Sequence, residues 1–145
     1  MKLLLFVCKG TELIELSAFL DVFGWDRHYN GGEVEVVTCG FTQTVECCFN
    51  FPVRIQMLID EVAVDDYACL AIPGGFEDYG YYEDAFNEKF LELVRDFDSK
   101  GKPIASVCVG ALPLAKSGVL KGRRATTYQL MGGKRFKQLE ECSQG

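Results

Sequence analysis

Histidine and metal-binding motifs are nearly absent from this chain of 145 residues. His28 is the only histidine, and no two cysteines have the Cys-x-x-Cys spacing of a structural zinc site. His28 follows Asp26 and Arg27 at the predicted end of a helix, where we expect it on the surface. A catalytic Cys-His pair of the usual kind is therefore disfavoured, and we predict no metal ion and no other cofactor.

An excess of positive charge and long hydrophobic runs are also lacking. The net charge is −6, which disfavours non-specific binding of nucleic acid or of anionic membranes. No segment is long and apolar enough to cross a bilayer. The apolar start, Met1 to Cys8, has no Ala-x-Ala-like cleavage site and is interrupted at Lys9, so we interpret it as a buried strand rather than a signal peptide. Hydrophobic residues at 48% and charged residues at 25% are typical of a soluble globular protein.

The cysteines indicate a reducing compartment. Their number is odd, and their spacing fits no disulfide framework. The seven positions are Cys8, Cys39, Cys47, Cys48, Cys69, Cys108 and Cys142. Because several lie in apolar, strand-like stretches, we expect them to serve as small hydrophobic residues, and we predict a cytoplasmic protein. No repeat, linker or low-complexity segment divides the chain, so residues 1–145 are predicted to form a single domain.

Strand-like and helix-like patterns alternate along the chain. Strands are predicted at 3–8, 34–38, 67–72, 103–107 and 124–127. Helices are predicted at 13–23 with Thr11 as the cap, at 86–97, at 110–117 and, as a polar helix or tail, at 131–142. The β-rich segments 44–51 and 53–55, separated by Pro52, are predicted to form an edge hairpin. This order implies a parallel sheet covered on both faces, with ligands beyond the carboxyl ends of its strands.

Cys108 occupies the point where an apolar strand runs straight into a helix. Small residues, Ser106 and Gly110, stand two positions on either side of it. This is the pattern of a nucleophile elbow, with cysteine in place of serine. Backbone N–H groups and the dipole at a helix start favour the thiolate, which is the reactive form. The alternative is a buried structural cysteine at the end of a strand.

Two further features lie at predicted strand ends. Glu15 stands in an apolar context, where burial would raise its pKa and let it donate a hydrogen bond to a thiolate; the alternative is a solvated helix residue. Gly74 and Gly75 end the strand at 67–72 and let the backbone approach a ligand. Together with the N–H of Val109, they are candidates for an oxyanion hole, and a plain turn is the alternative.

The sequence leaves two other segments open. The aromatic segment from Phe76 to Asp84 follows the glycines and is predicted to cover the site, to form a partner surface, or to be a polar surface loop. The basic residues Lys121, Arg123 and Arg124 either bind an anion or form a solvated turn after a helix.

Three segments together resemble the ThiJ/PfpI superfamily, whose fold is close to that of class I glutamine amidotransferases. They are Glu15 with residues 16–23, Ala71-Ile72-Pro73-Gly74-Gly75-Phe76, and residues 105–111 running on through 120–128. They follow the family's order and look most like bacterial members labelled thiazole-monophosphate biosynthesis proteins or intracellular proteases. The resemblance implies an α/β three-layer sandwich with a mostly parallel, flavodoxin-like sheet, and a homodimer.

The same resemblance implies roles for individual residues. Cys108 would be the nucleophile and Glu15 its protonated hydrogen-bond partner. Gly75 and Val109 would supply the oxyanion amides, and Gly74 and Tyr128 would line the substrate site.

The chain departs from the family pattern in two respects. Many relatives place a histidine just after the paired threonines at 126–127, where this chain has Tyr128 and Gln129. Proton transfer would then fall to Glu15, Tyr128 or water, and we do not expect peptidase activity. Relatives also continue with a further strand and helix, so this chain is either a piece or lacks that cover, which would expose apolar surface to a dimer partner or to aggregation.

These features support three hypotheses. The first is a cysteine-dependent hydrolase or lyase that acts on a small electrophile, as the glyoxalase-, deglycase-, amidase- and isonitrile-hydratase-like members of the family do. The second is a redox-sensing stress-response thiol protein that is oxidised at Cys108. The third is a non-catalytic, shortened family member.

Overall fold

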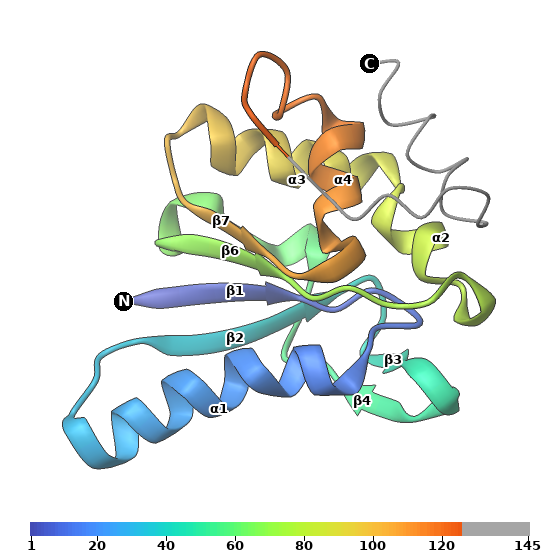
Figure 1. Cartoon of the computed structure of the whole chain (residues 1–145). Coiled ribbons are helices and arrows are strands. Elements are labelled where there is room, and N and C mark those ends of the chain that lie inside the picture. Colours follow the sequence, from blue (N-terminus) through green and yellow to red (C-terminus); the bar gives the residue numbers. More distant parts are fainter. Residues whose placement is uncertain (126–145) are drawn as a thin grey trace.

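The computed structural model describes residues 1–125 of the chain. Its main sheet has parallel strands in the order β5-β2-β1-β6-β7 (Figure 1). They are β1 (Lys2–Phe6), β2 (Glu35–Gly40), β5 (Met57–Leu58), β6 (Cys69–Ile72) and β7 (Ile104–Ser106). The central strands β1 and β6 have nearly continuous apolar sequences because both of their faces are buried.

Helices cover the two faces of this sheet. One face carries α1 (Leu13–Asn30), and the opposite face carries α3 (Glu88–Ser99) and α4 (Ala111–Ser117), with the short α2 (Tyr81–Ala85) beside them (Figure 1). The predicted α/β sandwich with a mostly parallel, flavodoxin-like sheet is therefore confirmed. Within residues 1–125, none of the helices has the length and apolar character needed to cross a membrane.

Alternate side chains of β1 pack into two hydrophobic clusters, one on each face. Phe6 belongs to the cluster under α3, where its ring stacks on Phe90 with 4.0 Å between centroids. Leu5 points the other way and shares a cluster with Leu16 of α1. This packing fixes where β1 ends, and so it fixes the loop at 8–12 at the carboxyl edge of the sheet.

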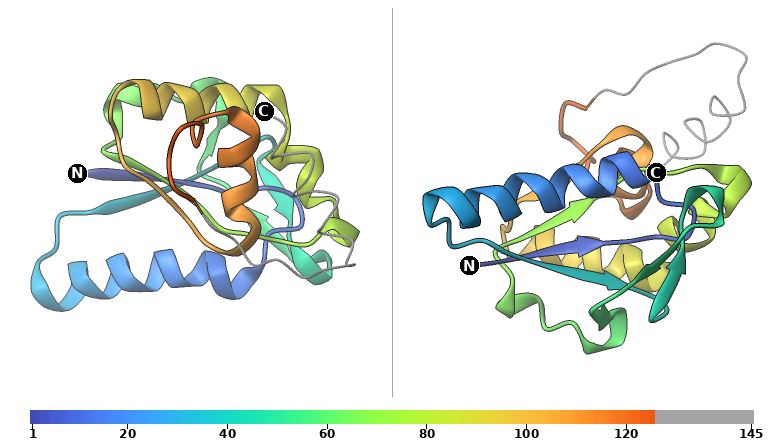
Figure 2. Two further views of the ribbon diagram at one scale, coloured as in Figure 1. Left: turned by 45° about the horizontal axis from the view of Figure 1, so that its top comes forward. Right: turned by 90° about the horizontal axis from the view of Figure 1, so that it is seen from below.

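The predicted hairpin is present as a small separate sheet. Strand β3 (Thr44–Glu46) pairs antiparallel with β4 (Pro52–Arg54), and the turn between them contains a 3-10 segment, Cys48–Asn50. Figure 2 shows the hairpin at the carboxyl end of the main sheet, near the start of α1. Further 3-10 segments are Ile59–Glu61, Val64–Asp66, Glu77–Tyr79 and Cys108–Gly110.

Several boundaries differ from the sequence prediction. Helix α1 continues beyond Phe23 to Asn30 and ends at Gly31, which adopts the left-handed φ of 72°. Glu12, not Thr11, precedes the helix, and no side chain caps it. Strand β5 and helix α2 were not predicted, because β5 has only two residues and α2 lies in the aromatic segment. The first half of the strand predicted at 124–127 is described and is not in a strand. Residues 126–127 and all of the predicted helix or tail at 131–142 lie outside the described residues.

Candidate active site

Three segments that follow neighbouring strands meet at one edge of the sheet, and two of them carry predicted site residues. Strands β1, β6 and β7 are neighbours and run parallel, so the segments that follow them emerge at the same edge. They are the loop at 8–12, the Pro73-Gly74-Gly75 turn and the turn at Cys108. The chain runs from β1 to β2 on one side of β1, and the later strand β6 lies on the other side of β1. Ligands of open α/β sheets bind at the carboxyl edge where the strand order reverses in this way.

Cys108 lies in a strained turn between β7 and α4. Its φ is +54°, in the left-handed region, which costs a residue other than glycine about 1–2 kcal/mol. A Cβ atom on Gly110 would lie 2.4 Å from the carbonyl oxygen of Ile72, so nothing larger than glycine fits there. The side chain of Cys108 is exposed. A buried structural role for this cysteine is therefore excluded by its position.

Gly74 lies between the side chains that the sequence singled out. Its N–H donates a hydrogen bond of 2.7 Å to Oε2 of Glu15. A Cβ atom on Gly74 would lie 2.7 Å from the same oxygen, 3.0 Å from Cβ of Cys108 and 3.1 Å from N of Val109. The structure thus brings Glu15, Cys108 and the Val109 amide around one glycine. Because Glu15 already accepts the Gly74 N–H, this amide positions the carboxyl, and Gly75 and Val109 are the remaining candidates for binding an oxyanion.

Gly75 joins the glycine turn to the loop after β1. It forms an isolated antiparallel bridge with Thr11, and the bridge's hydrogen bonds use the N–H groups of Glu12 and Phe76. The N–H of Gly75 itself takes no part in that bridge. A Cβ atom on Gly75 would lie 2.3 Å from the carbonyl oxygen of Gly10, so only glycine allows this close approach.

Tyr81 is a structural contributor that the sequence reasoning missed. It is completely buried, and its hydroxyl donates a hydrogen bond of 2.7 Å to the carbonyl oxygen of Pro73. Its ring also packs against Gly75, where a Cβ atom would lie 2.3 Å from Cδ2. The aromatic segment that follows the glycines therefore fixes their backbone through Tyr81, although its composition alone could not distinguish this residue from its neighbours.

The other thiols near this edge differ from Cys108 in burial. Cys8, Cys39, Cys47 and Cys48 are all buried. Burial raises the pKa of Cys8 well above its ordinary value, the pKa of Cys39 and of Cys47 to about 12, and that of Cys48 to about 11. These thiols stay protonated at neutral pH, which leaves Cys108 as the exposed cysteine among those described.

Of the remaining predicted residues, His28 and Arg123 are described by the structure and lie on the surface. Tyr128 lies outside the described residues. His28 is in the last turn of α1, where its ring contacts Trp25 and Tyr29, so it is away from the sheet edge as expected. Arg123 pairs with Asp98 at 2.7 Å on the surface, which fits the solvated turn rather than an anion site.

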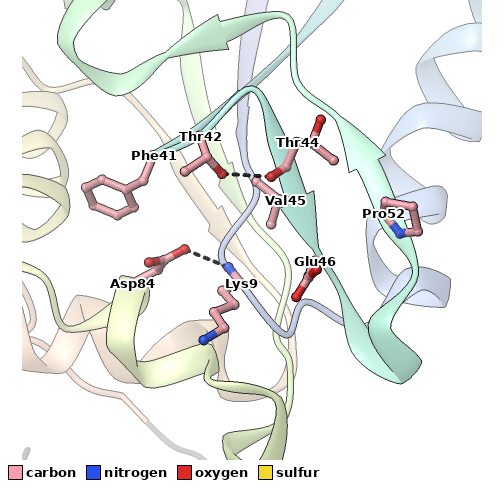
Figure 3. A pocket seen from close by; sticks show the side chains of 8 residues that line it. All are labelled: Lys9, Phe41, Thr42, Thr44, Val45, Glu46, Pro52 and Asp84. Atoms are coloured by element: carbon pink, nitrogen blue, oxygen red, sulfur yellow. Dashed lines mark hydrogen bonds between the residues drawn. The ribbon is translucent and has the colours of Figure 1, made fainter.

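A separate cavity of about 380 Å³ lies between the hairpin and α2 (Figure 3). Its lining includes Lys9, Glu46 and Asp84, and Oδ2 of Asp84 accepts a 2.7 Å hydrogen bond from the N–H of Lys9. Burial raises the pKa of Asp84. None of the predicted catalytic or oxyanion residues lines this cavity. The hydrogen bond anchors the loop at 8–12 to α2.

A family model described as DJ-1/PfpI matches residues 1–142. The chain belongs to the DJ-1/PfpI family. The resemblance to the ThiJ/PfpI superfamily is thus confirmed, and the sheet edge described above is the part of this family member that carries Cys108, the exposed cysteine within residues 1–125.

The chain matches only part of the length of each of three DJ-1/PfpI relatives. The chain is 30% identical over 129 residues to Deglycase PH1704 of Pyrococcus horikoshii, covering 88% of this chain and 72% of that protein. It is 37% identical over 78 residues to Deglycase PfpI of Pyrococcus furiosus, covering 54% of this chain and 45% of that protein. Its fold matches the structure of oxidized Toxoplasma gondii DJ-1 with a TM-score of 0.69 and 26% identity, covering 88% of this chain and 66% of that one.

Proposed function

We propose that this DJ-1/PfpI family member is a cysteine-dependent enzyme that acts on a small electrophile through Cys108. The observation that carries the proposal is the exposed thiol of Cys108, held at a φ of +54° directly beside the Gly74–Glu15 hydrogen bond. A strained, exposed nucleophile between a strand and a helix is the geometry of a nucleophile elbow. The deglycase names of two relatives suggest carbonyl compounds as the substrate class.

The arrangement supports addition of the thiolate to a carbonyl carbon. Sγ of Cys108 forms a bond to that carbon, and the π electrons of the carbonyl move onto its oxygen. In this proposal, the N–H groups of Gly75 and Val109 donate hydrogen bonds to the oxyanion, which the short distance between N of Val109 and a Cβ atom on Gly74, 3.1 Å, supports. Glu15 supplies or removes the proton, with one oxygen held by the Gly74 N–H. Peptidase activity is not proposed, because Tyr128 stands where many relatives have histidine.

Turnover of methylglyoxal and of a small amide tests this function. The native protein should convert at least one of them, and Cys108→Ala should abolish that conversion. Cys69→Ala is the matched control, because Cys69 is a half-buried thiol in β6 and should be dispensable. Turnover that survives Cys108→Ala contradicts the proposal. Absence of turnover together with an unreactive Cys108 indicates the non-catalytic alternative.

A second candidate function is redox sensing at the same thiol. It is favoured by the contrast between the exposed Cys108 and the four buried cysteines with raised pKa values. Hydrogen peroxide would transfer one oxygen to Sγ, giving a sulfenic acid and water, and a second equivalent would give the sulfinate. Peptide mass spectrometry after peroxide treatment should place the first oxygen on Cys108. Oxidation spread evenly over the cysteines would exclude this function.

We also propose that the protein pairs with a second copy of itself in a reducing compartment such as the cytosol. Helix α1 exposes large apolar side chains that the described residues do not cover, among them Ile14, Val22, Trp25 and Tyr29. Light scattering over a range of concentrations should show a dimer, and Val22→Lys should dissociate it. A native protein that stays monomeric at every concentration contradicts the pairing.

A further inference from the structure

The tip of the β3–β4 hairpin carries unusual backbone strain. Phe49 and Asn50 are consecutive residues with φ values of 61° and 56°, both in the left-handed region. Neither is glycine, and the cost for a residue such as phenylalanine is about 1–2 kcal/mol. A type I′ hairpin turn requires a positive φ at both central residues and usually has asparagine or glycine there, so a phenylalanine at the first position is the exception.

Phe49 and Asn50 are the two central residues of the hairpin turn, in which the N–H of Phe51 donates a 3.3 Å hydrogen bond to the carbonyl oxygen of Cys48. The loop at 8–12 of the proposed active site holds this turn in place. The N–H of Cys48 donates a 2.9 Å hydrogen bond to the carbonyl oxygen of Thr11, and Sγ of Cys48 lies 3.1 Å from the carbonyl oxygen of Gly10. Thr11 is also the bridge partner of Gly75. The hairpin tip and the glycine turn are thus fixed to the same short loop, so the tip has a set position relative to Cys108.

The strained turn directs an aromatic ring away from the core. The Phe49 side chain is 72% exposed, and its ring lies 5.6 Å from that of Tyr79 at an interplanar angle of 65°. Phe76, two residues after Gly74, is 44% exposed. Leaving a phenylalanine ring in water forgoes the stabilisation that its burial would supply. The fold therefore leaves aromatic surface exposed at an energetic cost, on segments that border the glycine turn next to Cys108.

We propose that Phe49, Tyr79 and Phe76 form an aromatic subsite for the non-reacting end of the substrate that Cys108 attacks. The inference rests on the proposed function and narrows its substrate class to carbonyl compounds with an aryl substituent. A flat apolar group packs on exposed rings by offset or edge-to-face contact. The three rings bear no charge, so the subsite does not select for a carboxylate or phosphate group on that end of the substrate.

The values of kcat/KM for phenylglyoxal and methylglyoxal test this subsite. The native protein should prefer phenylglyoxal, and Phe49→Ala should lower kcat/KM for phenylglyoxal about tenfold while changing the value for methylglyoxal less than twofold. Phe51→Ala is the matched control, because Phe51 is an exposed ring (57%) at the base of the same tip with no ring contact to Tyr79 among the described residues. Equal losses for both substrates, or no loss, overturn the subsite.

A second measurement separates this proposal from the proposed function. The alkylation rates of Cys108 by phenacyl bromide and by bromoacetone, each divided by the rate for free glutathione, report on the subsite without any turnover. The subsite predicts a higher normalised rate for phenacyl bromide, and Phe49→Ala or Tyr79→Leu should remove this advantage. The subsite is wrong if the two normalised rates are equal in the native protein. It is also wrong if both variants alter the oligomeric state but leave the advantage of phenacyl bromide unchanged. Both results hold whether or not the protein is an enzyme.

Discussion

Oε2 of Glu15 accepts a hydrogen bond of 2.7 Å from the N–H of Gly74, although 59 positions separate the two residues in the sequence. The same glycine approaches Cys108 so closely that an added Cβ atom would lie 3.0 Å from Cβ of the cysteine. The carboxyl and the thiol are therefore positioned through one backbone unit at the ends of adjacent strands.

Gly74→Ala should damage the site more than it damages the fold. The added methyl group would meet Oε2 of Glu15 at 2.7 Å and displace either the carboxyl or the thiol. Misplacement by about 1 Å costs on the order of 100-fold in rate, and overpacking costs about 1–3 kcal/mol of stability. Kinetics and urea unfolding measure the two effects. Gly24→Ala in α1 is the control: no atom lies within 4 Å of its added methyl group, and it should gain roughly 0.5–1 kcal/mol at unchanged activity.

Replacement of Cys108 should separate activity from stability. Cys108→Gly and Cys108→Ala both remove the thiol, but only glycine adopts a φ of +54° without strain. We therefore expect the glycine variant to be more stable than the alanine variant by about 1 kcal/mol, with both inactive. Urea denaturation of the two proteins gives the difference directly. An alanine variant of equal or greater stability would mean that the cysteine does not hold the left-handed conformation.

Alkaline pH should destabilise the fold through the buried thiols. The ordinary pKa of a cysteine in an unfolded chain is about 8.5, and burial raises the pKa of Cys39 and of Cys47 to about 12 in the folded protein. The unfolded chain therefore releases these protons first, so the stability that the two neutral thiols contribute is complete below about pH 8.5 and is lost as the pH rises toward 12. The urea midpoint should fall steadily over this range. Cys39→Val should make the urea midpoint fall less steeply with pH. If the midpoint of this variant falls as steeply as that of the native protein, the loss of stability is due to other groups.

Much of the architecture could be predicted because it depends on local patterns. Continuous apolar runs predicted β1 and β6, and the small residues around Cys108 predicted a strand–turn–helix segment there. The two-residue β5 was missed because so short a strand has no periodicity. Helix α1 was predicted too short because its last turns are polar and aromatic, and its end depends on Gly31.

The site was less predictable, because its contacts join distant parts of the chain. The sequence indicated Glu15, Gly74 and Cys108, but not that Glu15 would take the Gly74 N–H, since this depends on how two loops meet. The position of the hairpin tip against Thr11 and the burial of Tyr81 against Pro73 likewise follow from tertiary packing. The role of Tyr128 and the assignment of residues 1–145 to a single domain stay predictions.

The rate of iodoacetamide labelling at Cys108 as a function of pH tests the central claim most directly. An activated thiolate predicts a midpoint well below the free-thiol value of about 8.5. The midpoint should move in Glu15→Gln but not in Glu12→Gln, because Glu15 is the carboxyl that the Gly74 N–H holds beside Cys108. A midpoint at or above about 8.5 that is the same in all three proteins would contradict the claim that Cys108 is a nucleophile assisted by Glu15.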